Sequence, residues 1–391
     1  MNYKRLIDIN PHSNESYLLL GPRGTGKTTW IKENFPNSQY IDLLNEAVYF
    51  ELKADPHRLE TYFPANVETR IIIDEIQRVP ELLNEVHRAI EGSQRRFILT
   101  GSSARKLKRA GVNLLAGRAL QRSMYPLTAL EQQSDFNLTK TLLLGELPQV
   151  KKSSLPHDFL QTYVNTYLRE EVMQEGLVRN MRVFHRFLEI ASFSHAQQIN
   201  LSSIARELGV DQKTVASYFE ILEDLLIAMR IPVFDKRAKR RLSQHPKFYY
   251  FDVGVFRTLR PRGPLDLPTE ITGAALEGLI FQEMIAVNSY LHGAYEFYFW
   301  RTHNQVEVDL IAYGNHGLIA IEVKSSGYVE RKDYAGLIAF RNDYPMARCY
   351  LIYLGEEEKH EHGIHILPAQ TALLQLDKIL MCNHTIISTG Q

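Results

Sequence analysis

Gly21-Pro22-Arg23-Gly24-Thr25-Gly26-Lys27-Thr28 sets the architecture of the N-terminal part of this chain. A short apolar run, 16–20, precedes it, and a helix is expected over 27–34. The spacing GxxxxGK[ST] lets glycine N–H groups wrap phosphates at a helix N-terminus. In this pattern Lys27 reaches the β- and γ-phosphates of ATP, and the Thr28 hydroxyl holds Mg²⁺. The expected nucleotide contacts are Gly21, Pro22, Arg23, Gly24, Thr25, Gly26, Lys27, Thr28 and Thr29.

Further strands and helices alternate after this loop. Strands are expected at 39–44, 70–75 and 97–100, and a helix at 80–91 begins with a proline, as helices often do. Apolar runs of this length are typical of buried parallel strands, and parallel strands need helical crossovers. The pattern therefore predicts a three-layer α/β domain over 1–130.

Polar residues at the ends of these strands complete the nucleotide site. Asp74 ends the run Ile71-Ile72-Ile73 and is expected to join the Mg²⁺ site, while Glu75 is placed to polarise a water for attack on the γ-phosphate. Thr100 is a candidate γ-phosphate sensor, or else a strand-end hydroxyl that caps local backbone. Arg118 is a candidate arginine finger, or else a surface ion pair.

The composition is that of an ordinary globular protein. The 391 residues suggest roughly two to four domains, and Lys+Arg and Asp+Glu both number 45, so the net charge indicates no class of partner. The two cysteines, Cys349 and Cys382, form no CxxC pair, which argues against a disulfide framework or a Cys-rich zinc site. No leader sequence or long apolar segment is seen, and we expect a cytoplasmic protein without a membrane partner.

The middle of the chain has helical spacing over 131–198, where a lid or linker is expected, followed by a helix–turn–helix and basic hairpin over 199–262. The turn Gly209-Val210-Asp211 separates its two helices. Two short strands after it make the segment similar to a winged helix, whose recognition helix would present Gln212, Lys213, Thr214 and Ser217.

Positive charge is concentrated in 230–262, where ten cations face two acids for a net charge of +8. Such a cluster is the electrostatic footprint expected for a nucleic-acid backbone, and DNA is the expected partner. The alternative is a lid or a protein contact with solvated charges. The cations are Arg230, Lys236, Arg237, Lys239, Arg240, Arg241, Lys247, Arg257, Arg260 and Arg262.

A separate α/β unit is expected over 270–391, with a helix at 273–291, strands at 295–301, 306–313, 318–325 and 349–354, and a helix at 330–342. Period two places Glu322 and Lys324 on one strand face. Asp309 and Glu322, with Glu277 or Glu283 from the preceding helix, could bind Mg²⁺ or Mn²⁺, and Lys324 could steady the attacked phosphate. The alternative is an apolar strand with charged ends.

This C-terminal pattern resembles the PD-(D/E)xK restriction-endonuclease-like fold, with Val308 in place of the proline. The whole chain resembles the prokaryotic AAA-type ATPases with a C-terminal domain of unknown function. That resemblance is carried by the segments 20–28, 74–77, 99–103, 115–118, 125–127, 163–168, 214–215 and 246–252. It implies an AAA-type ATPase domain, a winged helix and a nuclease-like domain.

Three functions follow from these patterns. The first is an ATP-hydrolysing protein that couples nucleotide state to nucleic-acid binding, with a Mg²⁺-dependent DNA endonuclease in its C-terminal domain. The second is a nucleotide-switched regulatory or scaffold protein whose nuclease-like domain is silent. The third is an ATPase that remodels proteins. AAA-type modules commonly place an arginine beside a neighbouring subunit's nucleotide, which leaves a homo-oligomer open.

Overall fold

The N-terminal part is built on a parallel sheet of five strands in the order β2-β3-β4-β1-β5. The computed structural model describes residues 3–103, 115, 117–174, 178, 180–235, 245–261 and 268–381. The strands are β1 (Ser16–Leu20), β2 (Gln39–Asp42), β3 (Ile71–Asp74), β4 (Phe97–Gly101) and β5 (Ala119–Ser123). The helices are α1 (Lys27–Asn34), α2 (Glu46–Ala54) and α3 (Leu82–Ser93), with 3₁₀ turns η1 (Pro56–Tyr62) and η2 (Ile76–Arg78). The predicted parallel α/β architecture is confirmed.

Side chains alternate between the two faces of this sheet. Leu18 and Ile73 join one apolar cluster, whereas Leu19 and Ile72 join another. Because both faces are covered, the central strands β1, β3 and β4 are buried along their whole length and mostly apolar, as buried parallel strands are. The order β3-β4-β1 brings three carboxyl ends to one edge, where the loop after β1 meets the ends of β3 and β4.

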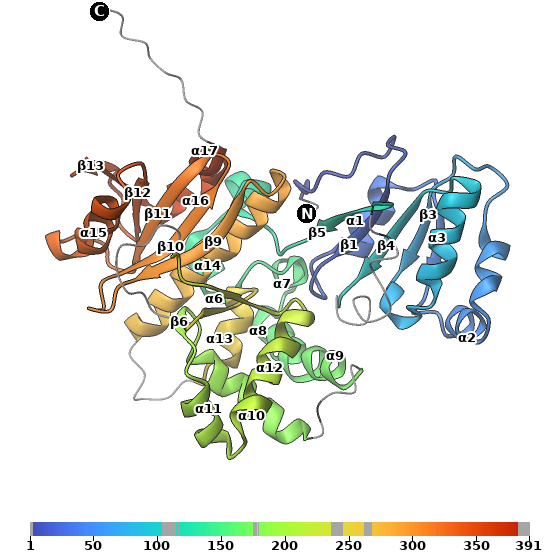
Figure 1. Cartoon of the computed structure of the whole chain (residues 1–391), viewed down its shortest axis with the longest axis horizontal. Coiled ribbons are helices and arrows are strands. Elements are labelled where there is room, and N and C mark those ends of the chain that lie inside the picture. Colours follow the sequence, from blue (N-terminus) through green and yellow to red (C-terminus); the bar gives the residue numbers. More distant parts are fainter. Residues whose placement is uncertain are drawn as a thin grey trace, which may run out of the picture.

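The middle of the chain is mostly helical and extends below the two sheet domains in Figure 1. It begins with β5 leading into short helices and continues to a long amphipathic helix, α10. Its elements are α5 (Ala129–Gln132), η4 (Gln133–Asp135), α6 (Leu138–Leu144), α7 (Pro148–Lys152), α8 (Pro156–Thr162), a π-helical turn η5 (Tyr163–Tyr167), α9 (Leu168–Gln174) and α10 (Met181–Ser192).

A helix–turn–helix follows, made by α11 (Leu201–Leu208) and α12 (Gln212–Asp224). Gly209 ends α11 at φ +68°, a left-handed conformation that glycine adopts without steric cost. Asp211 caps α12 by accepting a hydrogen bond from the backbone of Thr214. A three-stranded sheet packs beside these helices in the order β6-β8-β7, formed by β6 (Gln197–Gln198), β7 (Ala228–Ile231) and β8 (Lys247–Tyr250).

The C-terminal part is a mixed six-stranded sheet in the order β13-β14-β12-β11-β10-β9. Its strands are β9 (Tyr295–Arg301), β10 (Glu307–Gly314), β11 (Gly317–Lys324), β12 (Arg348–Tyr353), β13 (Lys359–Glu361) and β14 (Ile364–Pro368). Helix α13 (Val253–Leu259) packs on α6 of the middle region. The helical segments of the C-terminal part are α14 (Pro268–Tyr290), η6 (Arg331–Tyr334), α15 (Ala335–Asp343), α16 (Ala369–Leu374) and α17 (Leu376–Met381). The predicted order of helix, three strands, helix and strand is present, with β9, β10 and β11 antiparallel and β12 parallel to β11.

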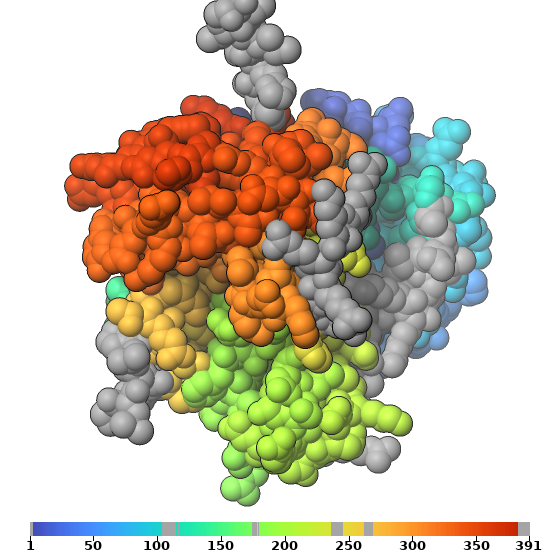
Figure 2. All heavy atoms as spheres, turned by 60° about the vertical axis from the view of Figure 1, so that its left-hand side comes forward, coloured from blue at the N-terminus to red at the C-terminus, as the bar shows by residue number. Residues whose placement is uncertain are grey.

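Helix α14 connects the three parts of the molecule. Leu276 and Phe281 lie in the apolar core that continues from the middle helices to the C-terminal sheet. Ala286 and Tyr290, near its end, lie instead in a cluster on the N-terminal sheet. The C-terminal and middle parts also form one continuous surface in Figure 2. A movement at the N-terminal sheet therefore has a packed route to the C-terminal part.

Candidate functional site: a nucleotide cavity and a carboxylate cluster

The loop after β1 has the backbone that phosphate binding requires. Gly24 and Gly26 have φ of +86° and +93°, which residues with a Cβ rarely adopt. Gly26 caps α1 without a side-chain hydrogen bond, so the first amide groups of this helix remain available to an anion. The Lys27 ammonium donates to the backbone oxygens of Gly21 (2.7 Å) and Pro22 (3.2 Å). Burial lowers the pKa of Lys27, although the charge of Glu75 opposes this effect.

Asp74, at the end of β3, is held by three hydroxyl groups. Thr28 Oγ1 donates to its Oδ2 atom at 2.8 Å, Tyr40 donates to the same oxygen, and Thr100 donates to Oδ1. A threonine hydroxyl and an aspartate carboxylate side by side fit Mg²⁺, which prefers hard oxygen ligands. Thr28 and Asp74 are the residues that would hold this ion, which would neutralise phosphate charge when ATP is bound.

Glu75 is fixed by its neighbours. Its backbone has φ 62°, and its N–H donates to Thr100 Oγ1 at 3.0 Å. Its carboxylate accepts hydrogen bonds from Gln77 and, at 3.2 Å, from Ser102. Thr100 thus holds the Asp74 carboxylate and the Glu75 backbone. Its side chain does not line the cavity next to the β1–α1 loop.

A cavity of about 600 Å³ lies between the β1–α1 loop and the middle helices. The expected nucleotide-site residues that line it are Arg23, Gly24, Gly26, Lys27, Thr28, Thr29 and Glu75. Gly21 and Pro22 contribute backbone oxygens that hold Lys27, and Thr25 is fully buried with its hydroxyl donating to Pro22. The phosphate-binding loop and the end of β3 therefore adjoin the same cavity, where the sequence predicts the nucleotide.

The opposite wall of the cavity comes from residues that the sequence analysis did not assign to it. Tyr163 donates to the backbone oxygen of Arg23 at 2.8 Å, and Glu171 pairs with the Arg23 guanidinium at 3.3 Å. Tyr167 lies under the same guanidinium, 4.8 Å from its centre. Burial and then the charge of Glu75 raise the pKa of Glu171. These side chains lie more than a hundred positions from Arg23, so no local spacing pattern identifies them.

Arg5 joins the phosphate-binding loop to helix α14. Its guanidinium donates to the Thr25 oxygen (2.7 Å), the Tyr290 hydroxyl (3.0 Å) and the Glu131 carboxylate (2.9 Å). The Tyr290 hydroxyl in turn accepts from the Tyr125 backbone at 3.1 Å. An almost buried, bonded guanidinium is a rigid connection, because its planar fork fixes several partners at once.

Arg118 pairs with Glu91 of α3 at 2.6 Å and is not among the residues lining the cavity of its own chain. The pair with Glu91 agrees with the alternative of a surface ion pair, and the arginine finger stays a prediction.

The cations of segment 230–262 were expected to form a surface for a nucleic acid, and the structure describes only some of them. Lys236, Arg237, Lys239, Arg240, Arg241 and Arg262 lie outside the described residues. Among the others, Arg230 pairs with Glu223 (2.9 Å) and Arg260 with Glu270 (3.2 Å). Lys247 is only 2% exposed. Burial corrects the expectation that Lys247 and Arg260 face a nucleic acid, whereas Arg230 is partly exposed and its contact with a nucleic acid stays a prediction.

The Lys247 ammonium lies among carboxylates of the C-terminal part. Its Nζ atom is 2.7 Å from Glu277, 2.8 Å from Glu307 and 3.3 Å from Asp309. Tyr249 also donates to Glu277, at 2.6 Å. Burial by itself lowers the pKa of Lys247, but the charges of Glu277 and the other carboxylates outweigh it, and the pKa lies well above its ordinary value.

The expected metal ligands Glu277, Asp309 and Glu322 do not fit a metal in this arrangement. Asp309 uses one oxygen for Lys247 and the other for the Val323 N–H, at 2.8 Å. Glu322 pairs with Lys324 at 2.6 Å. Within the described ranges, no group of three or more His, Cys, Asp or Glu is arranged to hold a metal ion. Glu283, the other expected ligand, is fully buried and accepts from the Ala129 N–H.

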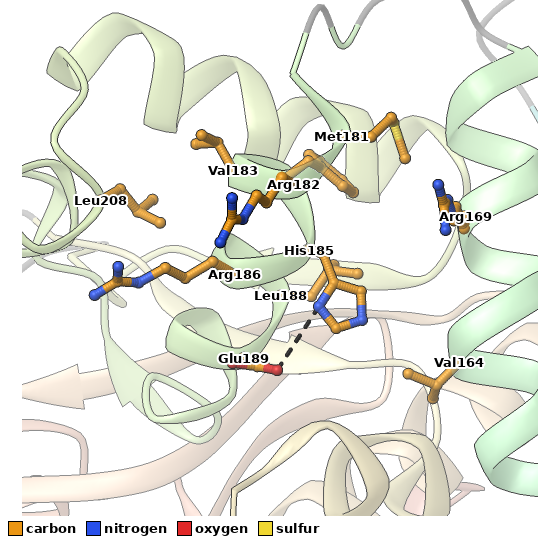
Figure 3. A pocket seen from close by; sticks show the side chains of 11 residues that line it. Val164, Arg169, Met181, Arg182, Val183, His185, Arg186, Leu188, Glu189 and Leu208 are labelled. Atoms are coloured by element: carbon orange, nitrogen blue, oxygen red, sulfur yellow. Dashed lines mark ion pairs between the residues drawn. The ribbon is translucent and has the colours of Figure 1, made fainter.

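A second cavity, of about 680 Å³, lies between α9, α10 and α11. Arg182 and Arg186 lie on the side of Leu208, Arg169 lies on the opposite side, and His185 pairs with Glu189 at 3.7 Å (Figure 3). All three arginines are exposed. This positive, partly apolar surface adjoins the helix–turn–helix.

Three family models match successive parts of the chain. Residues 13–132 match an AAA domain, and residues 135–266 and 272–372 match two domains of unknown function, DUF8612 and DUF4143. Together with the loop geometry, the first match identifies an AAA-type ATPase domain in the N-terminal part. None of the helices in the described ranges is both long enough and apolar enough to cross a membrane.

Similar individual proteins are distant. An uncharacterised protein of Haemophilus influenzae is 22% identical over 204 residues, which are 48% of this chain and about half (51%) of that protein. The Aeropyrum pernix ORC1 protein in complex with DNA has a TM-score of 0.29 at 12% identity, covering 63% of this chain and 86% of that one. Protein VC1899 from Vibrio cholerae has a TM-score of 0.24 at 10% identity, covering 93% and 97%. These scores are too low to establish a shared fold.

Proposed function

We propose that this chain is an ATP-hydrolysing switch whose AAA-type domain couples nucleotide state to nucleic-acid binding by the middle region. The observation that carries the proposal is the composition of the nucleotide cavity. Its floor is the β1–α1 loop with Lys27 and Thr28, and its opposite wall is Tyr163 and Glu171 of the middle helices. A ligand in this cavity contacts both parts, so its presence or hydrolysis changes how they are held together.

Within this cavity the roles follow from chemistry and position. Lys27 and the free amides of α1 are suited to the phosphates, and Thr28 and Asp74 to Mg²⁺. Glu75 is the base that polarises the attacking water. Its bonds to Gln77 and Ser102 hold it beside the cavity, and Ser102 also lies 3.4 Å from Glu171. A change in the position of Glu171 can therefore be transmitted through Ser102 to the carboxylate of Glu75.

The nucleic-acid surface is proposed on the helix–turn–helix. Gln212, Lys213 and Ser217 are exposed on α12, and Arg182 and Arg186 are exposed on α10 nearby. Lysine and arginine at such a surface bind backbone phosphates and make affinity fall with salt. DNA is the partner that we propose, and a protein partner is the alternative outcome of the test.

For the C-terminal part there are two interpretations. The endonuclease interpretation requires Asp309, Glu322 and Lys324 to act with a divalent metal on a phosphodiester. The second interpretation, binding or assembly without cutting, is favoured by the Lys247 ion pairs, because they engage the carboxylates that the first interpretation needs. A homo-oligomer in which Arg118 serves a neighbouring subunit, and a cytoplasmic location, also remain proposals.

One assay tests these proposals together. Wild type, Lys27→Ala and Lys324→Ala are compared for ATP hydrolysis, and for binding and cleavage of plasmid and single-stranded DNA, with Mg²⁺ or Mn²⁺. We expect hydrolysis to be lost in Lys27→Ala alone, salt-sensitive DNA binding that depends on ATP, and no cleavage. No hydrolysis by wild type under any condition would contradict the proposed function. Cleavage that Lys324→Ala abolishes would establish the endonuclease interpretation.

The nucleic-acid half has its own control. The double variant Arg182→Ala/Arg186→Ala should weaken DNA binding. The slope of log K against log salt concentration should become less steep by about one to two units, one for each lost phosphate contact. Lys359→Ala, an exposed lysine of β13 in the C-terminal sheet, should leave binding unchanged. Salt-independent binding, or none, would favour the protein-directed alternative.

A further inference from the structure

Strand β8 presents two polar side chains to the C-terminal part. Successive residues of a strand point to opposite faces, so Lys247 and Tyr249 share one face. Tyr249 packs on Phe281 of α14, with ring centroids 4.2 Å apart, whereas Phe248 packs on Phe219 of α12 at 5.0 Å. The strand belongs to the middle sheet, yet one of its faces completes the C-terminal part.

The surroundings of the Lys247 ammonium are those of a bound cation. An ammonium group has three donors, and this one has three carboxylates within 3.3 Å, supplied by α14 and β10. The side chain is 2% exposed. A lysine is buried this completely only where partners compensate its charge. Lys247 therefore compensates the charge of the buried carboxylates, and the carboxylates compensate the charge of Lys247.

The carboxylate cluster has little net negative charge left to bind a metal ion. The carboxylates are Glu277, Glu307, Asp309 and Glu322, and the cations paired with them are Lys247, Arg301 and Lys324. With all seven groups ionised, four negative charges and three positive charges leave −1. A divalent ion added to this set would leave +1 in a largely buried place. Glu277 and Asp309 also line a cavity of about 370 Å³, so an ion that entered it would compete with the Lys247 ammonium for carboxylates that already pair with it.

We propose that Lys247 is the permanent counter-ion of this carboxylate cluster, which keeps divalent metals out and fastens the middle sheet to α14 and β10. The C-terminal part then moves with the middle region as one unit and acts by binding rather than by metal-dependent cutting. This inference deepens the second interpretation of the C-terminal part given under the proposed function, and it does not rest on the ATP site.

The test measures Mn²⁺ binding to the full chain without nucleotide, by electron paramagnetic resonance. Wild type should show no saturable binding up to about 1 mM, weaker than the range in which even extracellular Ca²⁺ modules bind their ion. Lys247→Met removes the charge with little change in volume and should tighten Mn²⁺ binding by about tenfold or more, since it leaves the carboxylates without their counter-ion. Adding Asp309→Asn should reverse this gain. Lys140→Met, at an exposed position of α6, should behave as wild type.

Saturable Mn²⁺ binding by wild type that Asp309→Asn abolishes would overturn the inference. That comparison does not need the Lys247 variant, so it decides the question even if Lys247→Met fails to fold. The link that Lys247 makes between the middle sheet, α14 and β10 is tested separately. Native wild-type protein is acetylated, and the rate of modification of each lysine is measured by mass spectrometry. Lys247 should react at least about tenfold more slowly than the exposed Lys213, because reaction requires the cluster to open. Equal rates would contradict this link. Neither measurement involves ATP hydrolysis, so failure here is distinct from failure of the proposed function.

Discussion

The nucleotide cavity and the carboxylate cluster each contain a buried lysine near acidic groups, but the two lysines have opposite roles. Lys27 bonds to neutral backbone oxygens five and six residues away, and it lines an open cavity of about 600 Å³. Lys247 bonds to carboxylates 30 to 62 residues away and is almost without exposed surface. The first is ready to exchange its partners for phosphates, whereas the second already has its full set. A similar inventory of residues can therefore make either a ligand site or a structural ion cluster.

The largest expected effect is on catalysis in the cavity. Lys27→Ala should lower the rate of ATP hydrolysis by about 100- to 1,000-fold, the range found when one group that stabilises transition-state charge is removed. Steady-state phosphate release measures it. Lys140→Ala, an exposed lysine of α6, is the matched control and should hydrolyse ATP normally. A Lys27→Ala protein with wild-type turnover would place the chemistry elsewhere.

A large effect on stability is expected in the cluster. Lys247→Met leaves buried carboxylates without their cation and should lower the free energy of unfolding by about 3 kcal/mol. Urea denaturation measures it. Lys359→Met removes a lysine that pairs with Glu357 at an exposed position and should cost less than about 1 kcal/mol. Equal costs would show that the two lysines differ less than their surroundings indicate.

Glu146, which is buried between α6 and α7 and pairs with Lys151, should make the stability depend on pH. Burial raises the pKa of Glu146 to about 7, although Lys151 and Thr141 oppose the rise. The folded state then binds a proton that the unfolded state releases near its ordinary value of 4.5, so stability falls as pH rises between about 4.5 and 7.

Glu146→Gln removes this titration. The loss of unfolding free energy between pH 5 and 7 should be smaller in the variant by about 2 kcal/mol. Urea denaturation at a series of pH values measures it. Parallel pH profiles for the two proteins would mean that Glu146 is ionised throughout this range.

The smallest effect is expected at the link from the loop to α14. Tyr290→Phe removes the hydroxyl of α14 that accepts hydrogen bonds from Arg5 and from the Tyr125 N–H, and it should cost about 1 kcal/mol of stability. We expect ATP to protect α14 from hydrogen exchange in the wild type, and we expect this protection to be lost in Tyr290→Phe. Tyr328→Phe, at a position that is 67% exposed, should keep the protection. Unchanged protection in Tyr290→Phe would remove Arg5 from the coupling route.

Sequence patterns predicted the N-terminal part well, because its signals are local. The helix after the loop begins at Lys27 and ends at Asn34 as expected, and the apolar runs at β1, β3 and β4 became buried strands. Spacing alone specifies such elements, since a phosphate-binding loop and the strand before it lie within a dozen residues. The strand β5 was missed because only one of its residues, Leu120, is a large apolar side chain.

Long-range partners could not be predicted in this way. Arg5 and Glu171 reach the cavity from opposite sides, and their partners lie 20 to 285 residues away. Lys247 was counted with an exposed basic hairpin, although the alternation in Lys247-Phe248-Tyr249-Tyr250 already placed it beside Tyr249 on one strand face. The sequence pattern did not show which part of the molecule this face contacts. The packing of Tyr249 on Phe281 shows that the face lies against α14.

Counting Mn²⁺ ions bound to the wild-type chain, with and without a non-hydrolysable ATP analogue, tests the difference between the two regions most directly. We predict one ion per chain in the presence of the nucleotide and none in its absence, because the cavity takes its metal with ATP and the cluster is satisfied by Lys247. An ion that binds without nucleotide and is lost in Asp309→Asn would contradict this account.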